Sequence, residues 1–84
     1  MPDAVRRAIE RFPESAEAIA NLAGESEAFR SICEDYDLGL ATLRRFESQL
    51  GDNRQRIAEY RTLLLELERE IERALATAGR PIDP

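Results

Sequence analysis

Carboxylates are the one abundant group in this chain that could carry out acid–base or metal chemistry. The 84 residues include 17 acidic side chains but no histidine, so the usual general base and the usual metal ligand are both missing. Glu66, Glu68, Glu70 and Glu72 alternate along one stretch, a spacing that scatters them around a helix instead of converging them on one point. We therefore interpret them as a solvated surface and predict no catalytic residue, no metal site and no cofactor.

The single cysteine, Cys33, is the other reactive group. It lies among apolar residues beside Ile32 and Tyr36, where a thiol is expected to be buried and inert. One cysteine cannot form a disulfide within the chain, so nothing indicates an oxidising compartment and we expect a cytoplasmic protein. No stretch has the apolar length of a signal peptide or a membrane span, and we expect no membrane association.

Glu47 is a carboxylate in an unusual position. Helical projection places it in the middle of an apolar arc between Leu43 and Leu50, where a charge is costly unless it is paired. Arg54 or Arg56, just beyond the following turn, is the predicted partner. The functional alternative is that Glu47 anchors a basic group of a binding partner.

The elements that position these groups are helices, because no segment alternates with the two-residue period of a strand. Pro13 suits the first position of a second short helix, which should end near Gly24, and Ser26 is a suitable N-cap for a third, long helix. Gly39 lies inside that helix, costs about 1 kcal/mol relative to alanine and allows a bend. The expected all-α domain, residues 1–84, has short helices within 3–24, long helices over 26–50 and 53–78, and a tail over 79–84.

An apolar stripe dominates the fourth helix. Its members follow one another at alternating spacings of three and four, the pattern of a coiled coil or helical hairpin: Ile57, Tyr60, Leu64, Leu67, Ile71, Ala74 and Ala78. The turn around Gly51 is short enough to force the two long helices into an antiparallel hairpin. A two-helix layer leaves one side of each stripe open, so we expect the short helices, a second copy or a foreign helix to close it. Self-pairing would give a dimer.

Two leucines project away from the apolar faces of their helices. Leu38 and Leu65 are isolated on the polar sides of the third and fourth helices, where single exposed leucines are common. They are nevertheless the first candidates for contacts with another protein.

The charge balance argues against a nucleic-acid partner. With 12 basic and 17 acidic residues the formal net charge is −5, so a phosphate backbone is repelled on average. The nearest basic cluster, Arg44 and Arg45 with Arg54 and Arg56 around the turn, is small and is interrupted by carboxylates.

A series of single residues between about 12 and 72 carries a family resemblance: Phe12, Pro13, Glu14, Ile19, Leu22, Phe29, Ile32, Tyr36, Leu43 and Glu47, before a long helix rich in leucine and glutamate. On these residues the chain resembles the YdcH-like family of small bacterial proteins. The resemblance implies a helical hairpin and brings no catalytic residue with it. The chain departs from the family in its first eleven residues, which are extra, in Gly39, which replaces an apolar residue, and in having no lysine.

These features predict a non-catalytic interaction module. We expect an adaptor or accessory subunit that packs through its amphipathic helices against a second copy, a larger protein or both. The candidate contact residues are Leu38, Leu65, Glu47, Arg54 and Arg56. The alternative is a nucleic-acid-associated factor that uses the arginines at the hairpin turn; an enzyme or metal carrier is the third class and is opposed by the absent histidine.

Overall fold

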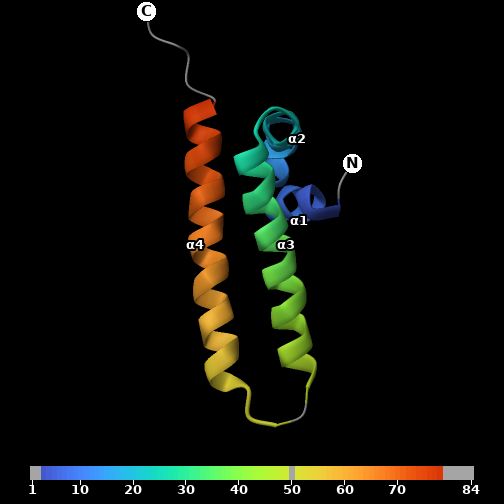
Figure 1. The fold of residues 1–84 in the computed structure, drawn as a ribbon, viewed down its shortest axis with the longest axis vertical. Helices are drawn as coiled ribbons and strands as arrows, with labels where there is room; N and C mark the ends of the chain where they lie inside the picture. Colours follow the sequence, from blue (N-terminus) through green and yellow to red (C-terminus); the bar gives the residue numbers. More distant parts are fainter. Residues whose placement is uncertain (1–2, 50, 79–84) are drawn as a thin grey trace, which may run out of the picture.

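The computed structural model describes residues 3–49 and 51–78 and confirms the predicted all-α fold (Figure 1). Within these residues there is no strand. The elements in chain order are α1 (Asp3–Arg11), the short 3₁₀ turn η1 (Pro13–Ser15), α2 (Ala16–Glu25), α3 (Glu27–Ser48) and α4 (Arg54–Ala78). None of the helices described combines the length and apolar character needed to cross a membrane. The predicted tail over 79–84 lies outside the described residues.

The second short helix begins later than predicted. Pro13 opens the 3₁₀ turn instead of an α-helix, and the Ser15 N–H donates to the Phe12 carbonyl at 2.9 Å in an i to i+3 pattern. Ser15 has φ −106° and ψ 15°, outside the α-helical region, so the α-helix starts only at Ala16. The helix also runs one residue past Gly24, which has no positive φ and does not end it.

Ser26 ends α2 and caps α3. Its extended backbone (φ −122°, ψ 112°) breaks the helix, while its Oγ accepts a hydrogen bond from the Phe29 N–H at 3.1 Å. Its own N–H donates to the Leu22 carbonyl at 2.8 Å, and Arg30 Nη1 donates to the Ala23 carbonyl at 3.1 Å. Ser26 therefore forms hydrogen bonds with backbone groups at the end of α2 and at the start of α3, and its extended backbone folds α2 back beside α3.

The two long helices form the predicted antiparallel hairpin (Figure 1). α3 ends at Ser48, two residues before the expected end, and Leu50 lies outside the described residues. Gly51 has φ +115°, a conformation open to glycine, and Asn53 Nδ2 donates to the Phe46 carbonyl at 3.4 Å across the turn. This turn returns the chain directly onto α3.

Gly39 does not interrupt α3, which is continuous from Glu27 to Ser48. The glycine is buried against α4, and a Cβ at this position would lie 3.0 Å from Leu64 Cδ2. The missing side chain thus leaves the space that Leu64 occupies. The family pattern of an apolar residue here would not fit this approach without a shift of Leu64.

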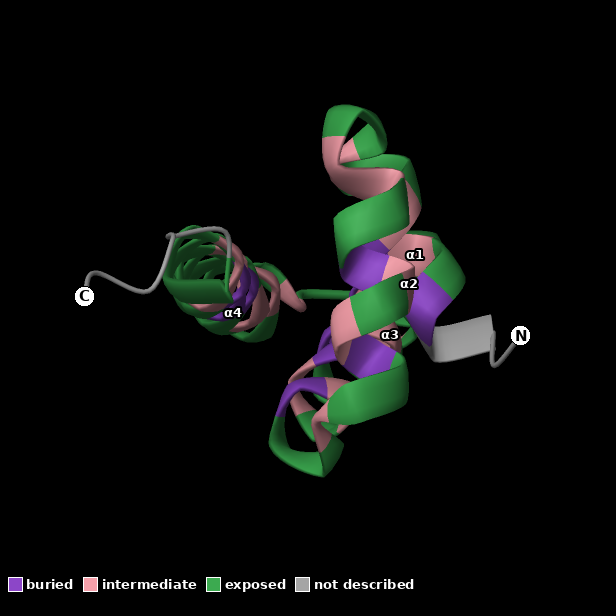
Figure 2. Cartoon of the chain, turned by 90° about the horizontal axis from the view of Figure 1, so that it is seen from above, coloured by how far each residue is buried: buried purple, intermediate pink, exposed green. Residues whose placement is uncertain are grey.

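The core lies on both flanks of α3. α1 packs on the side of α3 away from α4, α2 contacts α1, α3 and α4, and the buried face of α4 is turned toward α3 (Figure 2). Ala78, which was predicted in the stripe of α4, is exposed because it is the last residue of the helix, and Ile57, Tyr60 and Ala74 are only half-buried. The buried apolar residues are Val5, Ala8, Ile19, Ala23, Phe29, Cys33, Tyr36, Leu43, Leu64, Leu67 and Ile71.

The two helical glycines provide a matched test of the contact between α3 and α4. Gly24→Ala should raise the free energy of unfolding by up to about 1 kcal/mol, because Gly24 is exposed with open space around it. Gly39→Val should lower it by about 1–3 kcal/mol, because the branched side chain overlaps Leu64. Urea unfolding of both variants measures the difference. Full stability of Gly39→Val would show that Leu64 does not pack on this glycine.

Neighbouring leucines test the register of α4. Leu64→Ala should cost about 2–5 kcal/mol of unfolding free energy, because Leu64 is buried against α3. Leu65→Ala, the same change one residue further on, should stay within about 0.5 kcal/mol, because this side chain is exposed. Equal losses in thermal or urea unfolding would mean that the register is wrong.

Candidate interaction surface

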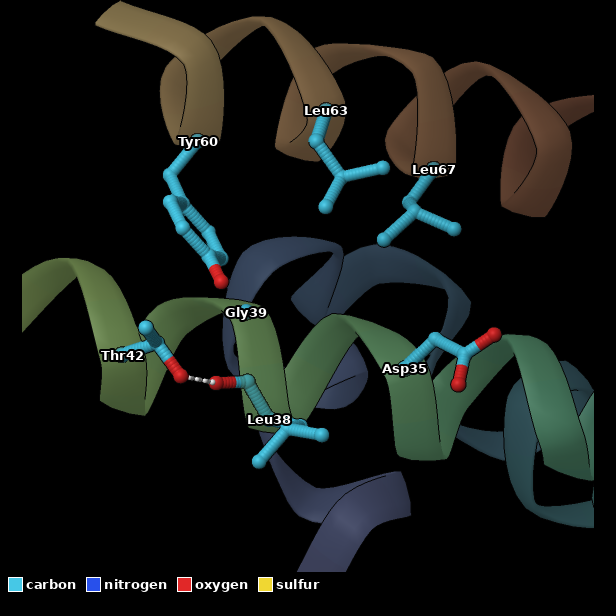
Figure 3. Close-up of a pocket in the computed structure, with 7 residues that line it drawn as sticks. All are labelled: Asp35, Leu38, Gly39, Thr42, Tyr60, Leu63 and Leu67. Atoms are coloured by element: carbon cyan, nitrogen blue, oxygen red, sulfur yellow. Dashed lines mark hydrogen bonds between the residues drawn. The ribbon is translucent and has the colours of Figure 1, made fainter. Parts of the chain in front are cut away.

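A shallow apolar groove runs between α3 and α4, with a volume of about 280 Å³. Tyr60, Leu63 and Leu67 reach from α4 toward α3 across the floor formed by Gly39 (Figure 3). The α3 wall consists of Asp35, Leu38 and Thr42. The Thr42 hydroxyl donates to the Leu38 carbonyl at 2.8 Å, so Asp35 is the charged side chain of this wall.

Two large apolar side chains are exposed at this groove. Leu38 is 67% exposed and Leu63 is 42% exposed, one on each wall. Leu65 is also exposed, at 56%, but it does not line the groove. The structure thus brings Leu38 together with Leu63 and not with Leu65.

Sequence reasoning missed Leu63. Leu63 directly precedes Leu64, a member of the apolar stripe, and projects about 100° away from it. A residue at this angle can be assigned either to the edge of the stripe or to the exposed surface. The signal available was its spacing of three from Tyr60 and four from Leu67, which puts all three on one side of α4.

A second groove continues along the same side of the hairpin. It has a volume of about 460 Å³ and is lined by Leu22, Ser26, Ala28, Phe29, Ile32, Arg73, Ala74, Thr77 and Ala78. Several of its lining residues lie seven or fourteen positions from residues of the first groove. On α3, Ala28 lies seven residues before Asp35. On α4, Ala74 lies seven residues after Leu67, and Thr77 lies fourteen residues after Leu63. Residues seven apart lie on the same face of a helix, so the two grooves form one strip. We call this the open strip.

Glu47 is paired, but not with the predicted residues. Its Oε2 accepts from Arg61 Nη2 at 3.1 Å, and both side chains are substantially exposed. The prediction of Arg54 or Arg56 was wrong because these residues lie one to two helical turns nearer the hairpin turn. The antiparallel register sets Glu47 opposite Arg61, just as it sets Phe46 against Tyr60, whose ring centroids are 5.6 Å apart.

The arginines near the turn are engaged locally. Arg54 Nε lies 3.1 Å from Asp52 Oδ1, and the hydrogen bonds from the Arg54 side chain and backbone lower the pKa of Asp52. The Arg56 guanidinium lies 5.6 Å from the centroid of the Phe46 ring. The structure therefore does not bring Arg54, Arg56 and Glu47 together as one site.

A polar junction joins three helices on the opposite side of α4. Glu68 Oε2 accepts from the Tyr36 hydroxyl at 2.7 Å and lies 3.1 Å from Arg11 Nε. Burial, followed by the hydrogen bond to Glu68, raises the pKa of Tyr36, and the same carboxylate raises the pKa of Arg11. The junction is internally satisfied and links α1, α3 and α4, so we interpret it as structural.

Cys33 is fully buried in the core. Burial raises the pKa of its thiol to about 11, and the nearby charge of Glu34 adds to the increase. The thiolate, which is the reactive form, is thus strongly disfavoured at neutral pH. Among residues 3–49 and 51–78 there is also no group of three or more Cys, Asp or Glu side chains placed to hold a metal ion.

No family model, curated protein or solved structure matches this chain. The resemblance to the YdcH-like family remains a prediction from the residues that carry it.

The buried thiol predicts a loss of stability at high pH. The unfolded thiol ionises near its ordinary pKa of 9.0, whereas the folded thiol requires a pH of about 11. The unfolded state therefore binds fewer protons between these values, and the free energy of unfolding should fall as the pH rises above 9. Tyr36, whose folded pKa is also raised, should extend the fall above pH 10.

Urea unfolding at pH 8, 9 and 10 measures this slope. Cys33→Ala should have a lower stability at pH 8, because it opens a small cavity, and a flatter decline from pH 8 to 10. A decline equal to that of the parent protein would show that Cys33 does not titrate differently in the two states.

Proposed function

We propose that this protein is a non-catalytic protein–protein interaction module that binds through the open strip. The observation that carries this proposal is the exposure of Leu38 and Leu63 on opposite walls of one groove, in a chain whose other large apolar residues are mostly covered. Exposed apolar side chains on either side of a groove are typical of a surface that a partner covers. The expected occupant is a helix of a larger protein or of a second copy of the chain.

The arrangement of the N-terminal helices supports this assignment. α1 and α2 cover one flank of α3 and the end of the hairpin farthest from the turn, so they leave the open strip unoccupied among the described residues. A third helix lying between α3 and α4 would complete a small bundle. We also propose a cytoplasmic location, because a chain with a single cysteine forms no internal disulfide of the kind found in oxidising compartments.

We do not propose the nucleic-acid alternative. It depends on the arginines around the turn, of which Arg54 lies beside Asp52 and Arg56 lies over the Phe46 ring. The net charge of −5 opposes it further.

Site-specific photo-crosslinking tests the proposed function. A photoreactive phenylalanine analogue placed at position 38 or 63 should crosslink to a partner in the native host, because both side chains lie at the groove and are accessible. The same analogue at position 65 is the control, since Leu65 is exposed to a degree between those of Leu38 and Leu63, lies two residues from Leu63 on α4 and does not line the groove. Mass spectrometry of the crosslinked products distinguishes a second copy from another protein.

The pattern among these positions decides the result. Products at 38 and 63 and none at 65 support the open strip as the binding surface. Products only at 65, or at no position, would contradict the proposed function.

A further inference from the structure

We propose that the open strip binds one amphipathic helix of another protein, with apolar residues on its buried face and lysine or arginine residues along both edges. This inference rests on the proposed function and specifies its partner. It is argued from the charge along the strip and from its length.

Carboxylates border the strip on both helices. Asp35 lines the first groove on α3. On α4, Glu59, Glu66 and Glu70 are exposed and lie four residues before, three after and seven after Leu63, which places them on the same side of the helix. An incoming helix would therefore meet acidic groups along most of the first groove.

The basic groups lie toward the ends of the strip. Arg73 lines the second groove. Arg56 lies near the turn, seven residues before Leu63, and Arg45 lies at the same end of α3, seven residues after Leu38. The central part of the strip is thus acidic, and basic edges on the partner would complement it.

A second copy fits this surface less well. The α4 residues that bound the strip, from Tyr60 to Thr77, span about 26 Å at 1.5 Å per residue. Two copies meeting on this strip would bring the same carboxylates face to face on chains of net charge −5.

A single helix with basic edges avoids this repulsion. A helix of about 18 residues matches the length of the strip and fits between α3 and α4 as the third member of a bundle. Leucine or isoleucine residues at spacings of three and four would contact Leu38, Leu63 and the half-buried Tyr60.

Two model peptides test the proposal against the full-length chain. Both are capped, about 18 residues long and identical in their leucine positions, and they carry either lysine or glutamate along the edges. By fluorescence anisotropy at low salt, the lysine peptide should bind at least about tenfold more tightly than the glutamate peptide. Leu63→Asp should weaken its binding by a similar factor although the variant is more acidic, whereas Leu65→Asp should not weaken it.

Charge reversal on the acidic border of the strip provides a second test. The double variant E66K/E70K should invert the preference, so that the glutamate peptide binds more tightly, because both residues border the strip. The control E14K/E72K makes the same change in net charge away from the strip. Glu14 lines a separate groove beside Arg11 and Phe12 that shares no residue with the strip, and Glu72 is close enough to Arg11 to raise its pKa, so it lies on the opposite side of α4. The control should keep the preference of the parent protein, and circular dichroism should show that all variants remain folded.

Three results would overturn the proposal. Equal or tighter binding of the glutamate peptide would exclude basic edges. An unchanged preference in E66K/E70K would show that the acidic border plays no part. Dimerisation of the free chain in light scattering, abolished by Leu63→Asp, would assign the strip to a second copy. In each case crosslinking from positions 38 and 63 still reports on the proposed function separately.

Discussion

The structure depends on α3 having two flanks that must both be covered. Asp37 and Gly39, two residues apart, mark these flanks: Asp37 Oδ1 lies 3.3 Å from Arg7 Nε of α1, while Gly39 receives Leu64 of α4. α1 meets α4 through the ion pair of Arg11 with Glu68, whereas the backbones of both helices lie close to α3. An 84-residue chain can bury only a small core, and α3, which has five buried residues against three in α4, is the common support of the other helices.

Two short-range devices allow this arrangement. Ser26 ends one helix and begins the next without an intervening loop, which directs α2 back along α3. The junction of Tyr36, Glu68 and Arg11 then ties α1, α3 and α4 through one carboxylate that is only 14% exposed. Because all three polar groups are satisfied, the junction fixes the relative positions of the helices without leaving a buried charge unpaired.

The positions of the two N-terminal helices leave one side of the hairpin open. α1 occupies the flank of α3 away from α4, α2 lies at the end of the hairpin farthest from the turn, and the groove between α3 and α4 is left with Leu38 and Leu63 at its edges. The apolar floor stays shallow because Gly39 lets α4 approach closely. The contact that stabilises the hairpin thus also shapes the surface that we propose for binding.

The sequence by itself determined the helical class, the hairpin and the cap at Ser26, because heptad spacing and capping chemistry are local properties. It also indicated that Leu38 and Leu65 are exposed. The tertiary structure alone decided that Gly39 is a packing position and not a bend, since this depends on Leu64 from a distant helix. It also decided that Glu47 pairs with Arg61 and that Leu63, not Leu65, accompanies Leu38. These outcomes follow from the register between two helices, which no single helix encodes, because sliding α4 by one turn would exchange every cross-helix partner while preserving each local pattern.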